Sequence, residues 1–427
     1  MLQADLTWID GAFLPGLQVH VAAGGRIAHV GALRHPPTRL LRNRALLPGF
    51  VSAHSHAFQR GLRGRGETFP AGDGSFWSWR EAMYDLVGRL DAAAFRALTL
   101  QTFREMRTAG ITTVGEFHYL HHAGPGDDYE LDALVLDAAR EAGVRLALLE
   151  AYYRTGGFGK PLEGAQRRFG SPSPERFWRQ VERLAPQLDL ATQTLGVALH
   201  SVRAVPPEEL GPVHREARRR GLVVHMHLEE QWREIEECQD AYGHTPFELL
   251  VREIDVLDGL TAVHCTHTHP NDLGLFLRAG GNVCVCPLTE ANLGDGIPTL
   301  PEGAPRDQLC LGTDSNARIA PLEEMRWLEY GQRLRQERRG CVRNPRGEVP
   351  QALLDAATRG GARALGLDVG AIAPGLWADL VVVDLEAPAL AGWEPETLLA
   401  SLVLGAGEEV VTASCVGGRW QEHRGAG

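Results

Sequence analysis

The middle of the chain alternates between short runs of apolar, β-branched residues and longer segments with apolar residues at helical spacing. The apolar runs predict eight strands, at Leu46–Val51, Ile111–Val114, Arg145–Leu149, Leu195–Leu199, Leu222–Val224, Leu260–Val263, Asn282–Cys286 and Leu309–Leu311. The helical pattern is clearest at Glu130–Ala142, Pro206–Arg220, Pro246–Glu253 and Pro321–Arg335. Strands that alternate with helices form a parallel sheet, so we predict an α/β fold with a TIM-like (β/α)8 barrel.

The two ends of the chain follow a different pattern, with short β segments broken by glycine and proline. Each end contains two clear examples: Leu17–Ala22 and Arg26–Val30, then Ala378–Asp384 and Val410–Val416. We expect the two ends to pair into one small β-sandwich domain, made of residues 1–46 plus 371–427. The barrel would then occupy residues 47–370.

Composition and charge exclude several classes of partner. Of the 427 residues, 44% are hydrophobic and 23% are charged, which is ordinary for a soluble globular enzyme. The net charge of −11, without a dense Lys/Arg stripe, argues against nucleic acid as a partner. No apolar run is long enough to span a membrane, and the N-terminus lacks the pattern of a signal peptide. The seven cysteines are scattered without a CxxC pair, which predicts reduced thiols and a cytoplasmic location.

Metal-binding side chains gather where the predicted strands end. In a barrel of this type, catalytic residues lie at the C-terminal ends of the strands. The eight strands lead in turn to His54, Glu116, Tyr152, His200, His227, His264, Pro287 and Asp314. Five of these eight positions carry a histidine or an aspartate, so we expect a metal site at this end of the barrel.

Four residues are the predicted ligands. His54 and His56 leave a strand on the same face and can reach one ion. On the fifth strand, His227 is nearer the mouth than His225, which we interpret as a hydrogen-bonded barrel histidine. A carboxylate at Asp314 would be costly to bury without a cation.

Three histidines and an aspartate suit zinc, with iron or manganese as alternatives. Comparable barrels can bridge two metals with a carbamylated lysine on the fourth strand. The single lysine of this chain, Lys160, lies in a glycine-rich loop instead. We therefore expect one zinc ion.

These motifs resemble the amidohydrolase superfamily over essentially the whole chain. The resemblance lies in Pro48–His56, in His227 followed by Glu230, in His264, in Leu311–Ser315 and in the tail Gly375–Val381. It implies a metal-dependent hydrolase that cleaves C–N bonds.

Three residues would then carry the chemistry. Asp314 would accept a proton from a metal-bound water, and His264 would polarise the electrophile or steady the hydroxide. Glu230 would pass a proton to the departing amine. The alternative for Glu230 is one of several exposed acids at a helix start.

A closer resemblance is to the N-formimino-L-glutamate deiminases of histidine degradation. It is carried by His54–Arg60, Ser75–Glu81, Gly115–His122, His200–Arg203 and Arg326–Arg333. The resemblance implies that the glutamate part is bound by Gln59, Arg80, Tyr119, His200 and Arg203. It also implies a homodimer, which is common in such relatives.

The residue types agree with this assignment, because arginine offers a carboxylate the bidentate pairing that a dicarboxylate substrate needs. A surface salt bridge with Glu81 or Asp85 is the alternative for Arg80. Alternative substrates are N-formimino-L-aspartate and a nucleobase such as guanine. A metal-free barrel relative that serves as a binding protein is the alternative outside enzymes. The neighbouring histidines that we interpret as structural are His118, His121, His122, His267 and His269.

Overall fold

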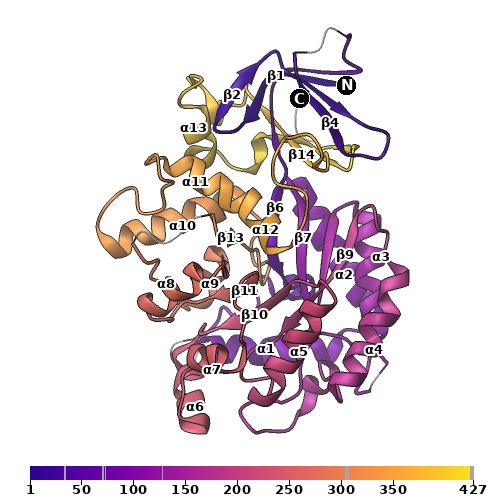
Figure 1. Cartoon of the computed structure of the whole chain (residues 1–427), viewed down its shortest axis with the longest axis vertical. Coiled ribbons are helices and arrows are strands. Elements are labelled where there is room, and N and C mark those ends of the chain that lie inside the picture. The colour runs from indigo at the N-terminus through magenta and orange to yellow at the C-terminus, as the bar shows by residue number, and fades with distance from the viewer. Residues whose placement is uncertain (33–34, 70–71, 73, 127, 303–306, 424–427) are drawn as a thin grey trace.

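The computed structural model describes residues 1–32, 35–69, 72, 74–126, 128–302 and 307–423, and it contains two eight-stranded sheets. Figure 1 places a barrel of strands and helices below a smaller, mostly β part that holds both chain ends. The predicted fold class is confirmed.

The barrel sheet is entirely parallel and follows the order β13-β12-β11-β10-β9-β8-β7-β6. Its strands are β6 (Phe50–Ser55), β7 (Ile111–His118), β8 (Arg145–Tyr152), β9 (Gln193–Leu199), β10 (Val224–Leu228), β11 (Leu260–His264), β12 (Asn282–Val285) and β13 (Leu309–Leu311). The first and last strands approach at their C-terminal ends. There the carbonyl of His54 accepts from the backbone N–H groups of Thr313 and Asp314, at 3.0 and 3.1 Å. This closure brings the two ends of the barrel sequence together at the predicted metal site.

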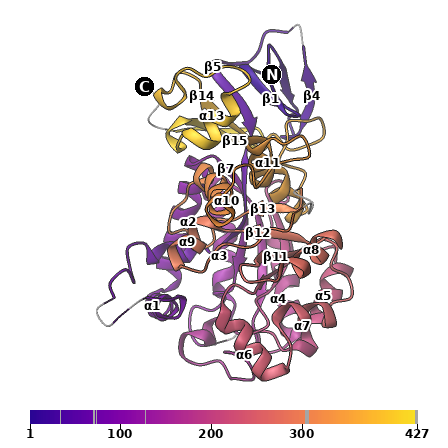
Figure 2. The same ribbon diagram turned by 90° about the vertical axis from the view of Figure 1, so that its left-hand side faces the viewer.

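Helices surround the barrel and connect its strands (Figures 1 and 2). They are α1 (Phe76–Arg89), α2 (Ala92–Thr108), α3 (Glu130–Ala142), α4 (Pro174–Leu184), α5 (Pro207–Arg219), α6 (Trp232–Tyr242), α7 (Pro246–Glu253), α8 (Pro270–Arg278), α9 (Pro287–Leu293), α10 (Pro321–Gln336), α11 (Val349–Asp355) and α12 (Gly361–Ala364). Short helical segments are η1 (Ala57–Leu62), η2 (Gly164–Arg168), η3 (Ala185–Gln187) and the π-helical η4 (Ala356–Gly360). The described part of the chain has no helix long and apolar enough to cross a membrane.

The small sheet joins strands from both chain ends in the order β16-β15-β14-β5-β1-β3-β4, with β2 paired to β1. Its strands are β1 (Leu2–Ile9), β2 (Ala12–Pro15), β3 (Gln18–Val21), β4 (Ile27–Gly31), β5 (Arg39–Pro48), β14 (Leu380–Asp384), β15 (Val411–Val416) and β16 (Arg419–Glu422). The strands expected to form a β-sandwich are thus linked by hydrogen bonds into one mixed sheet. Helix α13 (Leu398–Gly405) and the short segments η5 (Pro388–Leu390) and η6 (Glu408–Val410) lie between β14 and β15 in the chain. The domain division at residues 46/47 and 370/371 stays a prediction.

The predicted strand Leu46–Val51 is wrong as a single unit, because it belongs to both sheets. Strand β5 pairs with β14 in the small sheet, whereas β6 pairs with β7 in the barrel. Gly49 alone separates them, and its N–H donates to the carbonyl of Asp379 at 2.9 Å. Both strands are buried around this junction, so the apolar run has no polar residue to mark the change of sheet.

A buried ion pair ties the small sheet to the barrel. Arg145 at the start of β8 pairs with Asp379, with Nε–Oδ2 at 2.6 Å and a terminal nitrogen 3.1 Å from Oδ1. The two side chains are 4% and 1% exposed. The Asp379 carboxylate also accepts from the N–H of Gly417 at 2.7 Å. One carboxylate therefore fixes a barrel strand and a turn of the small sheet at once.

Candidate active site

The predicted site residues lie where the barrel strands end and the backbone turns sharply. Nine described non-glycine residues have positive φ, and five of them follow or end β10, β11 and β13: Glu229, His264, Cys265, Asp314 and Asn316. Left-handed backbone is costly for such residues and concentrates at functional sites. At Asp314 the turn is held by Asn316, whose side-chain amide donates to the carbonyl of Asp314 at 2.9 Å.

Four side chains point at one spot on the barrel floor. Nε2 of His227 lies 3.2 Å from Nε2 of His54 and 3.3 Å from Nε2 of His56. Oδ1 of Asp314 lies 3.2 Å from Nε2 of His54 and 3.3 Å from Nε2 of His56. Ligand atoms of a tetrahedral zinc site are about 3.3 Å apart, given bonds of about 2.0–2.1 Å. The set therefore has the spacing of a metal site, and its members are all buried.

The tautomers of two of these histidines also fit a metal. Nδ1 of His56 donates to the carbonyl of Phe117 at 2.7 Å, and Nδ1 of His227 donates to the carbonyl of His200 at 2.9 Å. Each Nε2 is thereby left with a lone pair that faces the cluster. Burial lowers the pKa of His54 and of His227, and lowers that of His56 to about 3. All three imidazoles are therefore neutral and able to ligate at neutral pH.

The fourth member is an ionised carboxylate. Burial alone would raise the pKa of Asp314, but its close contacts with His54 and His56 outweigh burial and lower that pKa. Among the described residues, these four form a donor set of three nitrogens and one oxygen. Such a set suits zinc, and it is compatible with iron or manganese.

His264 and Glu230 form a buried pair that lines the same cavity as the cluster. Nε2 of His264 lies 3.6 Å from Oε1 of Glu230, and its Nδ1 lies 3.2 Å from Oε1 of Glu290. Burial would lower the pKa of His264, but Glu230 and Glu290 outweigh it and raise this pKa to about 10. Burial raises the pKa of Glu230 to about 7. This pair can hold or release a proton next to the metal cluster.

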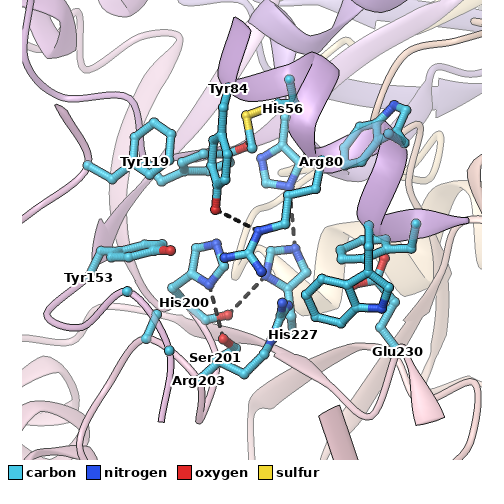
Figure 3. Close-up of a pocket in the computed structure, with 18 of the residues that line it drawn as sticks. His56, Arg80, Tyr84, Tyr119, Tyr153, His200, Ser201, Arg203, His227 and Glu230 are labelled. Atoms are coloured by element: carbon cyan, nitrogen blue, oxygen red, sulfur yellow. Dashed lines mark hydrogen bonds between the residues drawn. The ribbon is translucent and has the colours of Figure 1, made fainter. Parts of the chain in front are cut away.

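A cavity of about 240 Å³ opens above these residues. Its wall contains every residue predicted to bind substrate (Gln59, Arg80, Tyr119, His200 and Arg203) together with His56, His227, Glu230, His264 and Asp314. His54 lies beneath the cavity, fully buried. Figure 3 shows side chains from opposite walls meeting in this space, with Arg80 reaching in from α1 above His200 and His227. The structure therefore brings the predicted metal cluster and binding residues to one site.

Arg80 and Arg203 are each held through Nε. Nε of Arg80 donates to the Tyr84 hydroxyl at 2.6 Å, and Nε of Arg203 donates to Glu234 at 3.3 Å. Within the described residues, neither guanidinium has a hydrogen bond or ion pair at its terminal nitrogens. A salt bridge of Arg80 with Glu81 or Asp85 is not formed. The terminal nitrogens of both arginines can therefore bind an anion.

The other three candidates line the same cavity. The Gln59 side-chain amide donates to the Tyr119 hydroxyl at 2.7 Å, and Oε1 of Gln59 is buried without a partner among the described residues. Nδ1 of His200 lies 3.1 Å from the Ser201 hydroxyl, and its ring packs 5.1 Å from that of His227. Burial and the charge of Arg203 keep the pKa of His200 low, so it is neutral.

Comparison with known proteins agrees with this geometry. Residues 45–420 match the amidohydrolase family. The chain belongs to this family.

Three known proteins each align with most of the amidohydrolase chain. Formimidoylglutamate deiminase from Pseudomonas aeruginosa is 40% identical over 383 residues, which span 88% of this chain and 84% of the relative. The crystal structure of an amidohydrolase from Brucella melitensis is 32% identical, with a TM-score of 0.88 over 99% of this chain and 95% of that one. An adenosine deaminase from Xanthomonas campestris with bound zinc is 23% identical, with a TM-score of 0.81 over 99% of this chain and 93% of that one, and shows the fold alone.

A second polar cluster of the amidohydrolase lies outside the cavity, beneath α3 and α4. Oδ1 of Asp132 lies 2.9 Å from Nε2 of His118 and 3.0 Å from Nδ1 of His121, and Oδ2 accepts from the Gln180 amide at 2.6 Å. Nε2 of His121 donates to the carbonyl of Ala151 at 2.8 Å. This network joins β7, α3, β8 and α4, which supports the structural interpretation of these histidines. His118 itself ends strand β7 and does not lie in a loop.

Sequence reasoning missed several residues of the cavity and its surroundings. Tyr84, Tyr153 and Lys160 line the cavity, and Glu234 lies behind Arg203. Tyr84 is four residues beyond Arg80 on α1, a spacing that was available in the sequence. The position of Lys160 gave no such signal, because a loop between β8 and η2 brings it to the cavity.

Proposed function

We propose that this protein is a mononuclear zinc hydrolase that converts N-formimino-L-glutamate and water into N-formyl-L-glutamate and ammonia. One observation carries the proposal: two free guanidinium forks, Arg80 and Arg203, face one cavity whose floor is a His3Asp cluster. A C–N hydrolase of this family has no general need for two arginines, but a substrate with two carboxylates does. The 40% identity to a formimidoylglutamate deiminase supports the same substrate.

The zinc ligands in this proposal are His54, His56, His227 and Asp314. Their spacing, burial and neutral imidazoles fit the ion. When bound, zinc lowers the pKa of a coordinated water and supplies hydroxide at neutral pH. His200, at the fourth-strand end, lies outside this cluster, which supports a single ion.

Side chains of the protein then accept and donate the protons that the reaction at the formimino carbon requires. Asp314 accepts the proton of the attacking water, and His264 stabilises the charge that develops on the attacking oxygen. Glu230, with its pKa raised to about 7, can both take up a proton and give it to the terminal nitrogen. Attack of water oxygen on carbon and cleavage of the bond to the terminal nitrogen release ammonia. The other nitrogen keeps its bond, and the carbon becomes a formyl group.

The glutamate part is held by the five wall residues. Arg80 and Arg203 bind the two carboxylates as bidentate pairs. Gln59, Tyr119 and His200 orient the substrate by hydrogen bonds; Oε1 of Gln59 is buried without a described partner and suits an N–H of the formimino group.

The alternatives place different demands on the same cavity. N-formimino-L-aspartate is shorter by one methylene, and the same two forks would bind it. A nucleobase such as guanine would stack on aromatic rings such as Tyr153 and Phe169, which line the cavity. It would leave the terminal nitrogens of Arg80 and Arg203 without an anion to bind. We therefore favour the dicarboxylate.

An ammonia-release assay tests the proposal. Zinc-loaded protein should turn over N-formimino-L-glutamate with a higher kcat/KM than N-formimino-L-aspartate, and should not act on guanine. Elemental analysis should give one zinc per chain, and removal by a chelator should abolish turnover until zinc is restored. His227→Asn should bind less zinc, whereas His225→Asn, which changes the deeper neighbour on β10, should keep it. A higher kcat/KM with guanine would contradict the proposal.

We further propose a cytoplasmic homodimer. All seven cysteines are unpaired and buried, as expected of a protein from a reducing compartment. The oligomeric state is measured by light scattering after size exclusion, and a monomer would refute it.

A further inference from the structure

We propose that Glu234 is a positioning residue that couples substrate binding to proton transfer, by holding Arg203 with one carboxylate oxygen and Glu230 with the other. This inference rests on the proposed function and deepens it. Glu234 lies in the first turn of α6, beneath the cavity wall, and its side chain is 1% exposed.

The two contacts of Glu234 reach two different parts of the site. Its Oε1 accepts from Nε of Arg203 at 3.3 Å. Its Oε2 accepts from the backbone N–H of Glu230 at 3.3 Å. The Arg203 fork and the Glu230 carboxyl therefore share one anchor, although they come from the loops after different strands.

The Arg203 contact aims the guanidinium group. Glu234 contacts Nε, which restrains the guanidinium group and leaves its two terminal nitrogens able to donate into the cavity that Arg203 lines. Burial would lower the pKa of Arg203, but Glu234 and Glu230 outweigh it and raise that pKa. A buried guanidinium without this carboxylate would be an uncompensated charge whenever substrate is absent.

The Glu230 contact fixes the backbone of the proton shuttle. Glu230 follows Glu229, whose backbone is left-handed with φ of 51°, and precedes Gln231, the N-cap of α6. The carboxylate of Glu229 accepts from the N–H of Phe247 at 3.0 Å, which anchors the segment on its other side. With Glu234 holding the N–H of Glu230, the carboxyl stays 3.6 Å from His264.

Arg80 provides a comparison, because Tyr84, which holds its Nε, has no described hydrogen bond to Glu230 or His264. Its Nε donates to the Tyr84 hydroxyl at 2.6 Å, and that hydroxyl accepts in turn from the Gln166 amide at 3.1 Å. Among the described residues, no hydrogen bond links Arg80, Tyr84 or Gln166 to Glu230 or His264. Loosening Arg80 should therefore weaken substrate binding without disturbing proton transfer.

The chemistry of an amide makes Glu234→Gln a sharp test. Glu234 uses two acceptor oxygens for two N–H donors, whereas glutamine has one acceptor oxygen and an NH2 group that only donates. One of the two contacts must therefore be lost. Glu234→Asp is the second variant: it keeps the charge that balances Arg203, but its shorter side chain cannot reach both donors.

The measurements are kcat and KM for ammonia release from N-formimino-L-glutamate, with Tm and zinc content checked for each variant. Both Glu234 variants should raise KM and lower kcat, each by about tenfold or more, because small misplacements of positioned groups cost that much. Tyr84→Phe should raise KM by a similar factor and leave kcat within about twofold. Glu236→Gln, an exposed position on the same helix, is the matched control and should behave as the parent.

Each outcome decides a different question. If folded, zinc-loaded Glu234 variants keep the parent kcat and KM, the inference is wrong. A rise in KM with unchanged kcat would overturn the link to Glu230. An equal fall of kcat in Tyr84→Phe would also overturn it, because both anchors would then act alike. An inactive parent protein would instead refute the proposed function.

Discussion

His264 and Glu230 face each other across 3.6 Å, with both side chains buried and with His264 also 3.2 Å from Glu290. The histidine is thus flanked by two carboxyl groups at a buried position, where a cation and its partners interact more strongly than in bulk water. The pair lies next to the metal cluster, since His264, Glu230 and Asp314 line the same cavity.

Replacing His264 tests this arrangement. His264→Asn removes the cationic ring that faces the reacting oxygen, and we expect kcat to fall by about a thousandfold or more while the fold is retained. His269→Asn is the matched control, because His269 is exposed and caps α8 through an acceptor that asparagine can replace. Steady-state kinetics and circular dichroism provide the comparison, and near-normal turnover of His264→Asn would contradict the mechanism.

Replacing Arg203 tests the recognition of carboxylates. Arg203→Met keeps the bulk of the side chain and removes the fork, so KM for N-formimino-L-glutamate should rise by about tenfold or more. An analogue with an uncharged amide in place of the carboxylate that Arg203 binds should lose far less. Arg215→Met, which changes an exposed arginine of α5, should leave both KM values unchanged. Equal losses for both compounds would show that Arg203 does not bind a carboxylate.

His214 should make stability depend on pH. It is buried on α5, and burial together with Arg218 and Arg215 lowers its pKa to about 4 from an ordinary value of 6.5. Between these two values the unfolded chain binds a proton that the folded protein does not. The free energy of unfolding should therefore decrease as the pH falls from 6.5 toward 4.

The measurement is urea unfolding at several pH values in that window. His214→Gln removes the titrating group, so its free energy of unfolding should fall less steeply with decreasing pH than that of the parent. His20→Gln is the matched replacement at an exposed position of β3. An identical slope in the parent and in His214→Gln would refute the assignment.

The Arg145–Asp379 pair should contribute more to stability than exposed pairs between the same two parts. Asp379→Asn leaves a buried guanidinium without its counter-ion, and we expect the free energy of unfolding to fall by about 3–5 kcal/mol. Asp368→Asn breaks the exposed contact of Asp368 with Arg26 and should cost about 1 kcal/mol or less. Denaturant unfolding of both variants compares the two, and similar small losses would show that the buried pair is dispensable.

Much of this fold could be predicted from the sequence, because most barrel strands are short apolar runs between longer helical segments. Strand β10 is an exception: it contains two histidines, and the predicted strand Leu222–Val224 shares only Val224 with it. Helices α3 and α7 match their predicted limits, since Gly143 follows one and Thr245 with Pro246 begins the other. The clustering of His54, His56, His227 and Asp314 was predictable because parallel strands place their C-terminal residues at one end of the barrel.

The parts that sequence did not predict depend on contacts between distant segments. Glu234 is an example, because nothing in the local sequence pattern indicates that Arg203 lies against it. Likewise, the burial of His214 depends on how α5 packs. A helical pattern indicates which side of a helix faces the core, but not how deeply each residue at the edge of that side is buried.

The single residue between β5 and β6 limits how this enzyme can be rebuilt. Gly49 has no room for a side chain because a Cβ atom there would collide with Thr112. Strand β6, which contains His54, follows β5 after Gly49 alone, without a linker between the two strands. Strand β5 pairs with β14 of the small sheet. Grafting this barrel onto another accessory domain, or expressing it alone, would require a new chain end within a few residues of His54, a proposed metal ligand. The small sheet is thus inseparable from the barrel in practice, and recombination with relatives should succeed only when β5 and β6 are exchanged together.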